Sequence, residues 1–403
     1  MWQTFSAKKL IRKRGVAMIY VGIDISKYKH DCFICSNTGE VIVENLSFEN
    51  NQKGFQQFAD LLKPYDNSNV HIGLEATGHY GLNLKLFLEK NNYSFMEFNP
   101  LLIKEFAKSL TLRKTKTDKV DAFIIYQKLI SVPYKPNSKL FYHNYSIKSL
   151  SRLRETLIKQ RSKYLIQLTN ILDILFPEFK PFFSNRFGST ALFILNKYKT
   201  TTKIANMKDF ESISKNSHGR FPYSKFVKLK ELAKNTIGES NENFEFQLQS
   251  ILNLYFEINS EIDSIDKQIS TIIKELNPPT LSIPGIGAIS CASIISEFGD
   301  ISRFNNPGQM LSFAGLEPGI IQSGTMFANG KMVKRGSGYL RYTLMNVALV
   351  VISNNSTFYD YYYKKRSEGK CHRVALSHVC KKLIRIIYIL ETKHIQFDPS
   401  LIK

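Results

Sequence analysis

Four acidic residues in the first third of the chain have the types and spacing expected of a metal-dependent site. Asp24 lies in YVGIDIS and Glu75 in HIGLEATG, each within an apolar run that predicts a β-strand. Asp118 and Asp121, in TDKVD, are three residues apart and would share one face of a helix. Each acid alone is better explained as a surface group or a helix cap, so the prediction depends on all four meeting in one fold.

Carboxylates that crowd together repel one another unless cations neutralise them. Mg²⁺ prefers oxygen ligands and retains open positions for phosphate, so four acids suit two ions about 4 Å apart, and Mn²⁺ could substitute. Such ions could activate an attacking hydroxyl and stabilise the departing oxygen in phosphoryl transfer. Basic residues around the TDKVD pair would hold a nucleic-acid backbone near the metals, namely Arg113, Lys114, Lys116 and Lys119.

The elements that must position these acids alternate between strands and helices. Strands are expected at 18–25, 31–36, 41–48, 70–75 and 93–99, and helices at 50–63, 80–90, 101–110 and 116–129. This order is that of the ribonuclease H-like fold, a mixed sheet flanked by helices, over residues 18–140. The first strand, the fourth strand and the last helix would converge at one edge of the sheet. Beside Asp24, Gly22 and Ser26 would leave room for a ligand.

The middle of the chain, residues 141–277, is different in kind. From Leu248 to Leu276, apolar residues fall at alternating steps of three and four, a stripe typical of a coiled coil. A helix over about 146–175 repeats apolar residues every seven positions and should end before Pro177. The two helices are expected to pair antiparallel within one chain, and the seam could also join protomers. An intramolecular hairpin without a role in assembly is the alternative. The insertion at 184–245 carries no recognisable chemistry.

The last part, residues 278–403, is expected to be helical and to begin with a helix-hairpin-helix. In PGIG, Gly285 and Gly287 permit a tight turn whose backbone N–H groups could bind a DNA phosphate. A purely structural turn is the competing interpretation.

Two serines and several bases follow in a glycine-rich stretch between two expected helices. Ser323, before Gly324, should lie on a loop with an accessible hydroxyl, although an ordinary turn serine is the default interpretation. Ser337, in KRGSG, is the rival candidate, but its position before YLRYTL favours helix capping. The bases expected to contact nucleic acid here are Lys334, Arg335 and Arg341.

Composition limits the function classes. The chain has 403 residues, 43% hydrophobic, and a formal net charge of +21 at pH 7, which favours a nucleic-acid partner, although an AT-rich genome would produce the same bias. No apolar run of about 18 residues is present, so we expect no membrane association and a cytoplasmic, nucleoid-associated, prokaryotic protein. Residues 1–17 are interpreted as an extension, with Met18 as an alternative start.

The five cysteines form no disulfide framework of the secreted kind. Cys32 and Cys35 are expected to be buried in a strand. The spacing of Cys371, His372, His378 and Cys380 matches no common zinc site.

Together, the motifs VGIDISK, GLEATGHYG, RKTKTDKVDA, PGIG followed by FAGLEP, and QSG followed by VKRGSGYLR resemble the DEDD-type insertion-sequence transposases, the bridge-RNA-guided recombinases. The resemblance covers nearly the whole chain from Met18. It implies a RuvC-like domain with a catalytic, metal-binding tetrad and a C-terminal transposase domain with a nucleophilic serine. The tetrad matches Asp24, Glu75, Asp118 and Asp121, and the serine matches Ser323.

The resemblance also implies partners and a mechanism. In the family, the serine forms a covalent 5′-phosphoserine link to DNA, and active sites are assembled between protomers of a tetramer. A structured non-coding RNA pairs with both target and donor DNA. This chain departs from the pattern in residues 1–17 and in the insertion at 184–245, and the insertion leaves the details of RNA binding open.

Two other interpretations remain open. A metal-dependent junction resolvase or nuclease would hydrolyse DNA with water and would not need Ser323. A non-enzymatic DNA-binding scaffold would need neither Asp24 nor Glu75.

Overall fold

The computed structural model describes residues 18–76, 78–110, 118–137, 141–323 and 326–401, and the side chains of 118, 141–144, 320–323, 326–331 and 401 lie outside this description. The chain forms two compact units. The first contains residues 1–143 and 299–305, and the second contains residues 144–298 and 306–403.

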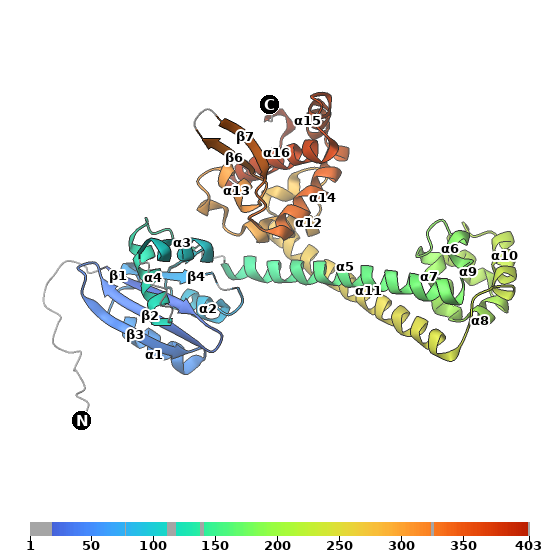
Figure 1. Cartoon of the computed structure of the whole chain (residues 1–403), viewed down its shortest axis with the longest axis horizontal. Helices are drawn as coiled ribbons and strands as arrows, with labels where there is room; N and C mark the ends of the chain where they lie inside the picture. Colours follow the sequence, from blue (N-terminus) through green and yellow to red (C-terminus); the bar gives the residue numbers. More distant parts are fainter. Residues whose placement is uncertain (1–17, 77, 111–117, 138–140, 324–325, 402–403) are drawn as a thin grey trace. The chain divides into compact units, whose positions relative to one another are not determined.

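The first unit is built on a mixed sheet of five strands (Figure 1). The strands are β1 (Ile19–Ile25), β2 (Lys29–Ser36), β3 (Val41–Glu49), β4 (Val70–Glu75) and β5 (Phe95–Phe98). Their order is β3-β2-β1-β4-β5, with β1 antiparallel to β2 and parallel to β4. The expected mixed sheet flanked by helices is confirmed.

Helices cover this sheet because its strands alternate between two apolar faces. The helices are α1 (Gln52–Leu62), α2 (Leu82–Lys90), α3 (Pro100–Leu110) and α4 (Asp118–Ile130), and a 3₁₀ helix, η1 (Asn67–Asn69), precedes β4. One core lies between the sheet and α1 with α2, and it includes Ile23, Phe58 and Leu74. A second core joins β5 to α3 and α4.

Local contacts in the first unit fix the start of α1 and the state of two cysteines. Asn51 caps α1, because its side chain accepts a hydrogen bond of 2.9 Å from the Gly54 N–H. Cys32 and Cys35 are free and buried in β2, as expected. Burial raises the pKa of the Cys32 thiol to about 12, so this thiol has the character of a small apolar group.

The second unit contains two long helices, α5 (Phe141–Leu175) and α11 (Glu242–Leu276). Arg154 of α5 pairs with Asp266 of α11, and Arg161 donates a 3.1 Å hydrogen bond to Asn259. From Arg154 to Arg161 the residue number rises by seven, and from Asp266 to Asn259 it falls by seven. The two helices therefore run antiparallel, as expected. A coiled-coil seam between protomers stays a prediction.

The C-terminal end of α11 departs from the predicted stripe. Ile273 is fully buried, whereas Leu276, which the spacing placed in the seam, is 48% exposed. At this end α11 contacts the next helix, α12, and a different face of α11 is buried.

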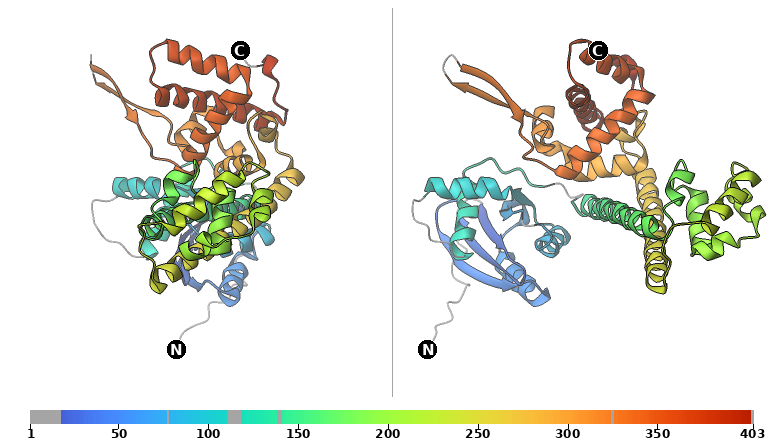
Figure 2. Two further views of the ribbon diagram at one scale, coloured as in Figure 1. Left: turned by 90° about the vertical axis from the view of Figure 1, so that its right-hand side faces the viewer. Right: turned by 45° about the vertical axis from the view of Figure 1, so that its right-hand side comes forward.

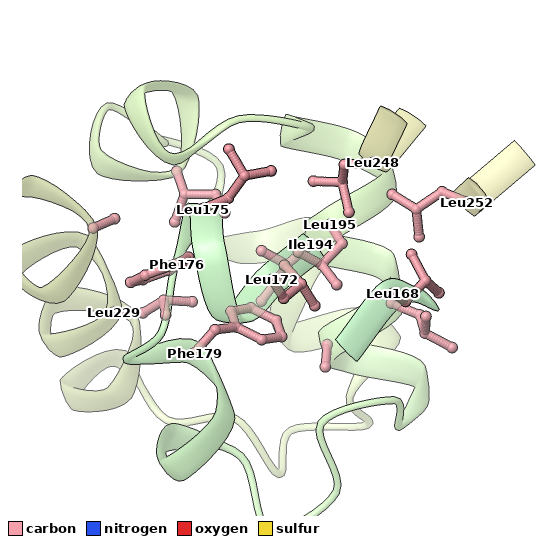
Figure 3. Close-up of a cluster of buried hydrophobic side chains, with 14 of the residues drawn as sticks. Leu168, Leu172, Leu175, Phe176, Phe179, Ile194, Leu195, Leu229, Leu248 and Leu252 are labelled. Atoms are coloured by element: carbon pink, nitrogen blue, oxygen red, sulfur yellow. The ribbon is translucent and has the colours of Figure 1, made fainter. Parts of the chain in front are cut away.

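The insertion at 184–245 folds into a helical cluster at the far ends of α5 and α11. The short helix α6 (Phe179–Phe182) precedes the insertion. The helices of the insertion are α7 (Ser189–Tyr198), α8 (Thr201–Ala205), α9 (Phe210–Asn216) and α10 (Tyr223–Lys234). In Figure 3, Leu172 of α5, Phe176 directly after this helix, Ile194 of α7 and Leu248 of α11 point toward one another. The insertion therefore has an apolar core of its own, which it shares with the two long helices.

The C-terminal part is helical with one exception. Its helices are η2 (Pro279–Ser282), α12 (Ala288–Phe298), α13 (Pro307–Phe313), α14 (Gly338–Asn354), α15 (Ser356–Ser367), α16 (His372–Lys393) and η4 (Pro399–Leu401). A two-stranded hairpin of β6 (Pro318–Ser323) and β7 (Met326–Met332) follows α13, where a loop was expected (Figure 2). A further 3₁₀ helix, η3 (Ile301–Arg303), belongs to the first unit. No helix in the described parts of the chain is long and apolar enough to cross a membrane.

Candidate functional site

Two of the four predicted acids end neighbouring parallel strands. The register of β1 and β4 pairs Ile23 with Leu74, and Asp24 and Glu75 are the next residues of the two strands. Ile23 and Leu74 lie in the core under α1 and α2, so alternation puts Asp24 and Glu75 on the opposite face. Adjacent strands are about 4.8 Å apart, which places the two half-buried carboxyl groups at one edge of the sheet.

The face that carries these carboxylates is the one that α4 crosses. A Cβ added at Gly22 would lie 2.4 Å from the carbonyl oxygen of Ala122 and 2.4 Å from the nitrogen of Tyr126. Only a glycine lets the helix backbone approach β1 this closely. The expectation that Gly22 leaves room for a ligand is therefore wrong, because α4 fills that space.

The same crossing positions the second pair of acids. Ala122 of α4 meets β1 at Gly22, which is two residues before Asp24 on the same strand. Asp121 directly precedes Ala122, so its backbone lies next to this crossing. On β4, Gly73 has the corresponding place, with Leu129 of α4 in van der Waals range. Asp121 is half-buried, and Asp118 begins α4 with a side chain outside the described set.

The donor chemistry of this edge fits a hard divalent cation in kind, because carboxylate oxygens are the ligands that Mg²⁺ and Mn²⁺ accept. Among the side chains that the structure describes, no group of three or more His, Cys, Asp and Glu residues is close enough to hold a metal ion. Asp24, Glu75 and Asp121 therefore do not form such a group by themselves, and the predicted tetrad would also need Asp118, whose side chain lies outside the described set.

The predicted basic residues near this edge are only partly described. Arg113, Lys114 and Lys116 lie outside the described residues. Lys119 forms a 2.9 Å ion pair with Glu44 of β3, and both side chains are largely exposed. Such a pair contributes little stability and leaves Lys119 able to exchange its partner for a phosphate.

Ser323 lies at the outer end of the hairpin. It is the last residue of β6 and pairs with Met326, the first residue of β7. Its side chain is outside the described set, so its position is known from the backbone alone. Because an isolated pair of strands is marginally stable in water, the hairpin depends on what holds its base.

Arg341 of α14 holds that base. Its Nη1 donates to the carbonyl oxygen of Ala314, just before the hairpin, at 3.2 Å, and to that of Lys334, just after it, at 3.5 Å. The N–H of Val333 also donates to the Glu317 carbonyl at 2.9 Å. Arg341 was expected to contact nucleic acid, and its observed contacts are with the protein backbone at both ends of the hairpin.

Lys334 and Arg335 lie directly after the hairpin and are exposed. Lys334 has a left-handed backbone, with φ of 53°. Both cations are therefore placed where they could meet a phosphate, beside the strands that carry Ser323.

Ser337 has the capping role that its sequence position predicted. Its hydroxyl oxygen accepts a 3.2 Å hydrogen bond from the Leu340 N–H at the start of α14. The hydroxyl also donates to Glu297 of α12 at 2.9 Å. These two contacts make Ser337 part of the frame of the C-terminal helices, so its hydroxyl is already engaged.

Glu297 was not singled out in the sequence. It is 4% exposed and receives two hydrogen bonds from Arg152 of α5, of 2.7 and 3.2 Å, with Lys148 at 3.4 Å. Burial alone would raise the pKa of Glu297, but the hydrogen bond from Arg152, the charges of Lys148 and Arg152 and the hydrogen bond from Ser337 hold it below its ordinary value. The guanidinium of Arg152 also stacks on Tyr339, 4.7 Å from the ring centre.

The PGIG turn has the shape expected of a tight turn before a helix. A short 3₁₀ helix, η2, precedes it, and α12 follows with the Cys291 N–H donating to the Gly287 carbonyl at 2.9 Å. Gly285 has φ of 98°, and a Cβ there would lie 3.0 Å from the Val351 Cα of α14. Gly287 faces open space, so it is the position at which a phosphate could approach the backbone.

The candidate zinc residues do not form one site. Cys371 is exposed and precedes α16, whereas Cys380 is buried, with its thiol toward the Leu344 carbonyl. His372 accepts or donates a 2.7 Å hydrogen bond with Tyr362 through Nδ1.

Two family models of known proteins match separate segments of this chain. A transposase model of the DEDD type from the IS110 group matches residues 21–177, which include all four acids. A model described as "Transposase IS116/IS110/IS902 family" matches residues 280–363, which include Ser323.

Relatives match over nearly the whole length of the chain. The "Pilin gene-inverting protein" of Moraxella bovis is 27% identical over 388 residues, covering 95% of this chain and 98% of that protein. The "Mini-circle putative transposase for IS117" of Streptomyces coelicolor is 22% identical over 408 residues, covering 95% and 96%. The chain belongs to the IS110 family of insertion-sequence transposases and is a DNA transposase or recombinase.

Proposed function

We propose that this transposase cuts and rejoins DNA with Ser323 as nucleophile and with Asp24, Glu75, Asp118 and Asp121 as the ligands of two divalent cations. The observation that carries the proposal is the position of Asp24 and Glu75 at the ends of two adjacent parallel strands, on the face crossed by α4. Bound Mg²⁺ or Mn²⁺ would supply Lewis-acid polarisation of a phosphate.

The chemistry assigned to the chain's own residues is a phosphoryl exchange. Oγ of Ser323 attacks a backbone phosphorus, the bond from phosphorus to the 3′ oxygen breaks, and the released 3′-hydroxyl takes up a proton. The 5′-phosphate is then held as a serine ester. Attack by the 3′-hydroxyl of another strand breaks this ester, returns a proton to Ser323 and restores a phosphodiester without ATP.

Rejoining distinguishes this proposal from a nuclease that uses water. The Moraxella relative is named for gene inversion, an outcome that requires cut ends to be rejoined. This name therefore favours a joining enzyme over a junction resolvase for the present chain.

We further propose that a structured guide RNA and a second copy of the chain are partners of the enzyme. A formal net charge of +21 suits a protein that holds both DNA and RNA. The family resemblance favours a dimer or tetramer with shared active sites. RNA that copurifies with the protein and pairs with both DNA substrates would support the guide, and purified protein without such RNA that still selects its sites would count against it.

The direct experiment traps the covalent intermediate. Wild-type protein, Ser323→Ala and Ser337→Ala are incubated with end-labelled donor DNA and Mg²⁺, and adducts are separated on a denaturing gel. We expect an adduct with the wild type, loss of about a thousandfold or more with Ser323→Ala, and an adduct with Ser337→Ala whenever that variant folds. Cleavage by Ser323→Ala at the wild-type rate would establish the nuclease alternative. Activity unchanged in both Asp24→Ala and Glu75→Ala would establish the scaffold alternative.

A further inference from the structure

The last long helices of the chain bring basic side chains onto one surface. α15 packs against both α14 and α16 near the end of the chain (Figure 1). The surface formed by α15, α16 and the turn between them, here called the α15–α16 lysine face, comprises Lys364, Lys365, Lys370, Lys381 and Lys382.

Contacts around Tyr361 show that lysines from the two helices meet. The ammonium group of Lys382 on α16 lies 4.8 Å from the centre of the Tyr361 ring, and that of Lys365 on α15 lies 5.6 Å from it. Burial and the charge of Lys364 both lower the pKa of Lys382. The ring of Tyr361 is therefore close to cations from both helices.

A second meeting point is His378. Partial burial is the main cause that lowers the pKa of its imidazole, and the charges of Lys381, Lys365 and Lys370 lower it further, against a smaller opposing effect of Glu368. These three lysines come from α16, from α15 and from the turn between them. The local potential is therefore positive from several directions.

The charge of this surface is poorly balanced within the protein. Residues 359–382 contain seven Lys and Arg residues and two acids, Asp360 and Glu368, and Glu368 pairs with Lys365 at 2.9 Å. Bases in the last turn of α15 are favoured by the helix dipole, but Lys370, Lys381 and Lys382 lie outside that turn. Repulsion among like charges opposes this arrangement, and a polyanion would relieve it.

Two exposed aromatic rings lie on a different face of α15 from Tyr361, and Arg366 links that face to the turn that carries Lys370, because its guanidinium donates to the Lys370 carbonyl at 2.9 Å. Tyr359 and Tyr363 are 46% and 51% exposed, and their ring centres are 4.4 Å apart on one face of α15. Arg366, three residues after Tyr363, is exposed on the same face. Rings flanked by cations are the combination with which proteins bind single strands, because unpaired bases stack on the rings while the cations hold the phosphates.

We propose that the α15–α16 lysine face, with Tyr359 and Tyr363, binds a single-stranded segment of DNA. The lysines contact phosphates, and the two tyrosines stack on bases. DNA is the partner because the chain is a DNA transposase, and strand exchange exposes unpaired DNA. The proposal does not depend on Ser323 or on the four acids. Either proposal can therefore fail while the other holds.

The test compares two pairs of lysines in the full chain. Binding of a fluorescent oligo(dT) of about 20 nucleotides, long enough for such a surface, is followed by anisotropy over a range of salt concentrations. The variant Lys370→Gln/Lys381→Gln removes two charges from the lysine face. The matched control, Lys225→Gln/Lys228→Gln, removes two charges from exposed positions of α10 and has the same net charge.

For the lysine-face variant, we expect the slope of log K against log salt to fall by about 1.4, since each phosphate contact on a single strand contributes about 0.7. The control should keep the wild-type slope. Tyr359→Leu/Tyr363→Leu should weaken binding at least about fivefold with an unchanged slope, because stacking is lost and charge is kept.

Two results would overturn the proposal. One is an equal loss of affinity in the lysine-face variant and in the α10 control, which would show that only net charge matters. The other is wild-type affinity for oligo(dT) in the lysine-face variant together with weakened binding of oligo(U), which would assign the surface to RNA. Circular dichroism melting of each variant confirms that it is folded.

Discussion

Arg152 of α5 donates two hydrogen bonds, of 2.7 and 3.2 Å, to the carboxylate of Glu297 near the end of α12. The two residues are not equivalent, because the side chain of Glu297 is 3% exposed and that of Arg152 is 44% exposed. A guanidinium that loses its partner can turn to water, whereas a buried carboxylate cannot.

The first prediction follows from this asymmetry. Arg152→Met leaves a buried charge with Lys148 and Ser337 as its remaining partners, and should cost about 3 kcal/mol of unfolding free energy. Glu297→Gln keeps hydrogen-bonding capacity and leaves no buried anion, so it should cost less. Urea unfolding followed by circular dichroism measures both, and a larger loss in Glu297→Gln would contradict the account.

The second prediction concerns pH. The pKa of Glu297 is below its ordinary value in the folded protein, so its stabilising contribution is present above the ordinary pKa of 4.5 and is lost as pH falls through the folded-state pKa. As the pH falls below about 5, the free energy of unfolding should therefore decrease more steeply in wild-type protein than in Glu297→Gln. Parallel urea midpoints over this range provide the measurement, and identical slopes would show that Glu297 is not responsible.

The third prediction concerns the hairpin that carries Ser323. Arg341→Met removes the group that bonds the carbonyls of Ala314 and Lys334, and each lost charge-assisted hydrogen bond should raise local opening about tenfold. Hydrogen exchange of peptides covering 318–332 should accelerate accordingly. Arg335→Met removes the same charge from an exposed neighbouring position, so its exchange should match that of the wild type. Acceleration in both variants alike would indicate a general effect of charge.

The fourth prediction tests the crossing of α4 over β1. In Gly22→Ala, the new methyl group would meet backbone atoms of Ala122 and Tyr126 at 2.4 Å, and backbone cannot rotate away as a side chain can. We expect a loss of about 3 kcal/mol or more, with α4 displaced from the carboxylates. Gly287→Ala adds the same methyl group in open space and should leave the melting temperature unchanged.

Sequence patterns predicted the succession of strands and helices in the first unit, because each element follows from the local spacing of apolar residues. They did not predict that Gly22 is covered, since an approaching helix leaves no mark on the strand it approaches. The hairpin at 318–332 was expected as a loop, because Ser323–Gly324 indicates a turn and its flanking strands are short and isolated.

Arg341 and Glu297 illustrate why contacts at a distance could not be predicted. Arg341 lies in KRGSGYLR, where a basic run indicates nucleic-acid binding, yet its acceptors are carbonyl groups that any residue could supply. Glu297 depends on Arg152, 145 residues away, and neither residue belongs to a recognisable motif.

In the proposed mechanism, Asp24 and Glu75, with the acids of α4, hold divalent ions. Binding of Mn²⁺ to the full chain, followed by electron paramagnetic resonance with donor DNA present, tests it most directly. We expect two bound ions in wild-type protein and in Asp173→Asn, an exposed change on α5, and loss of at least one ion in Asp24→Asn and in Glu75→Gln. Equal Mn²⁺ binding in all four proteins would contradict it.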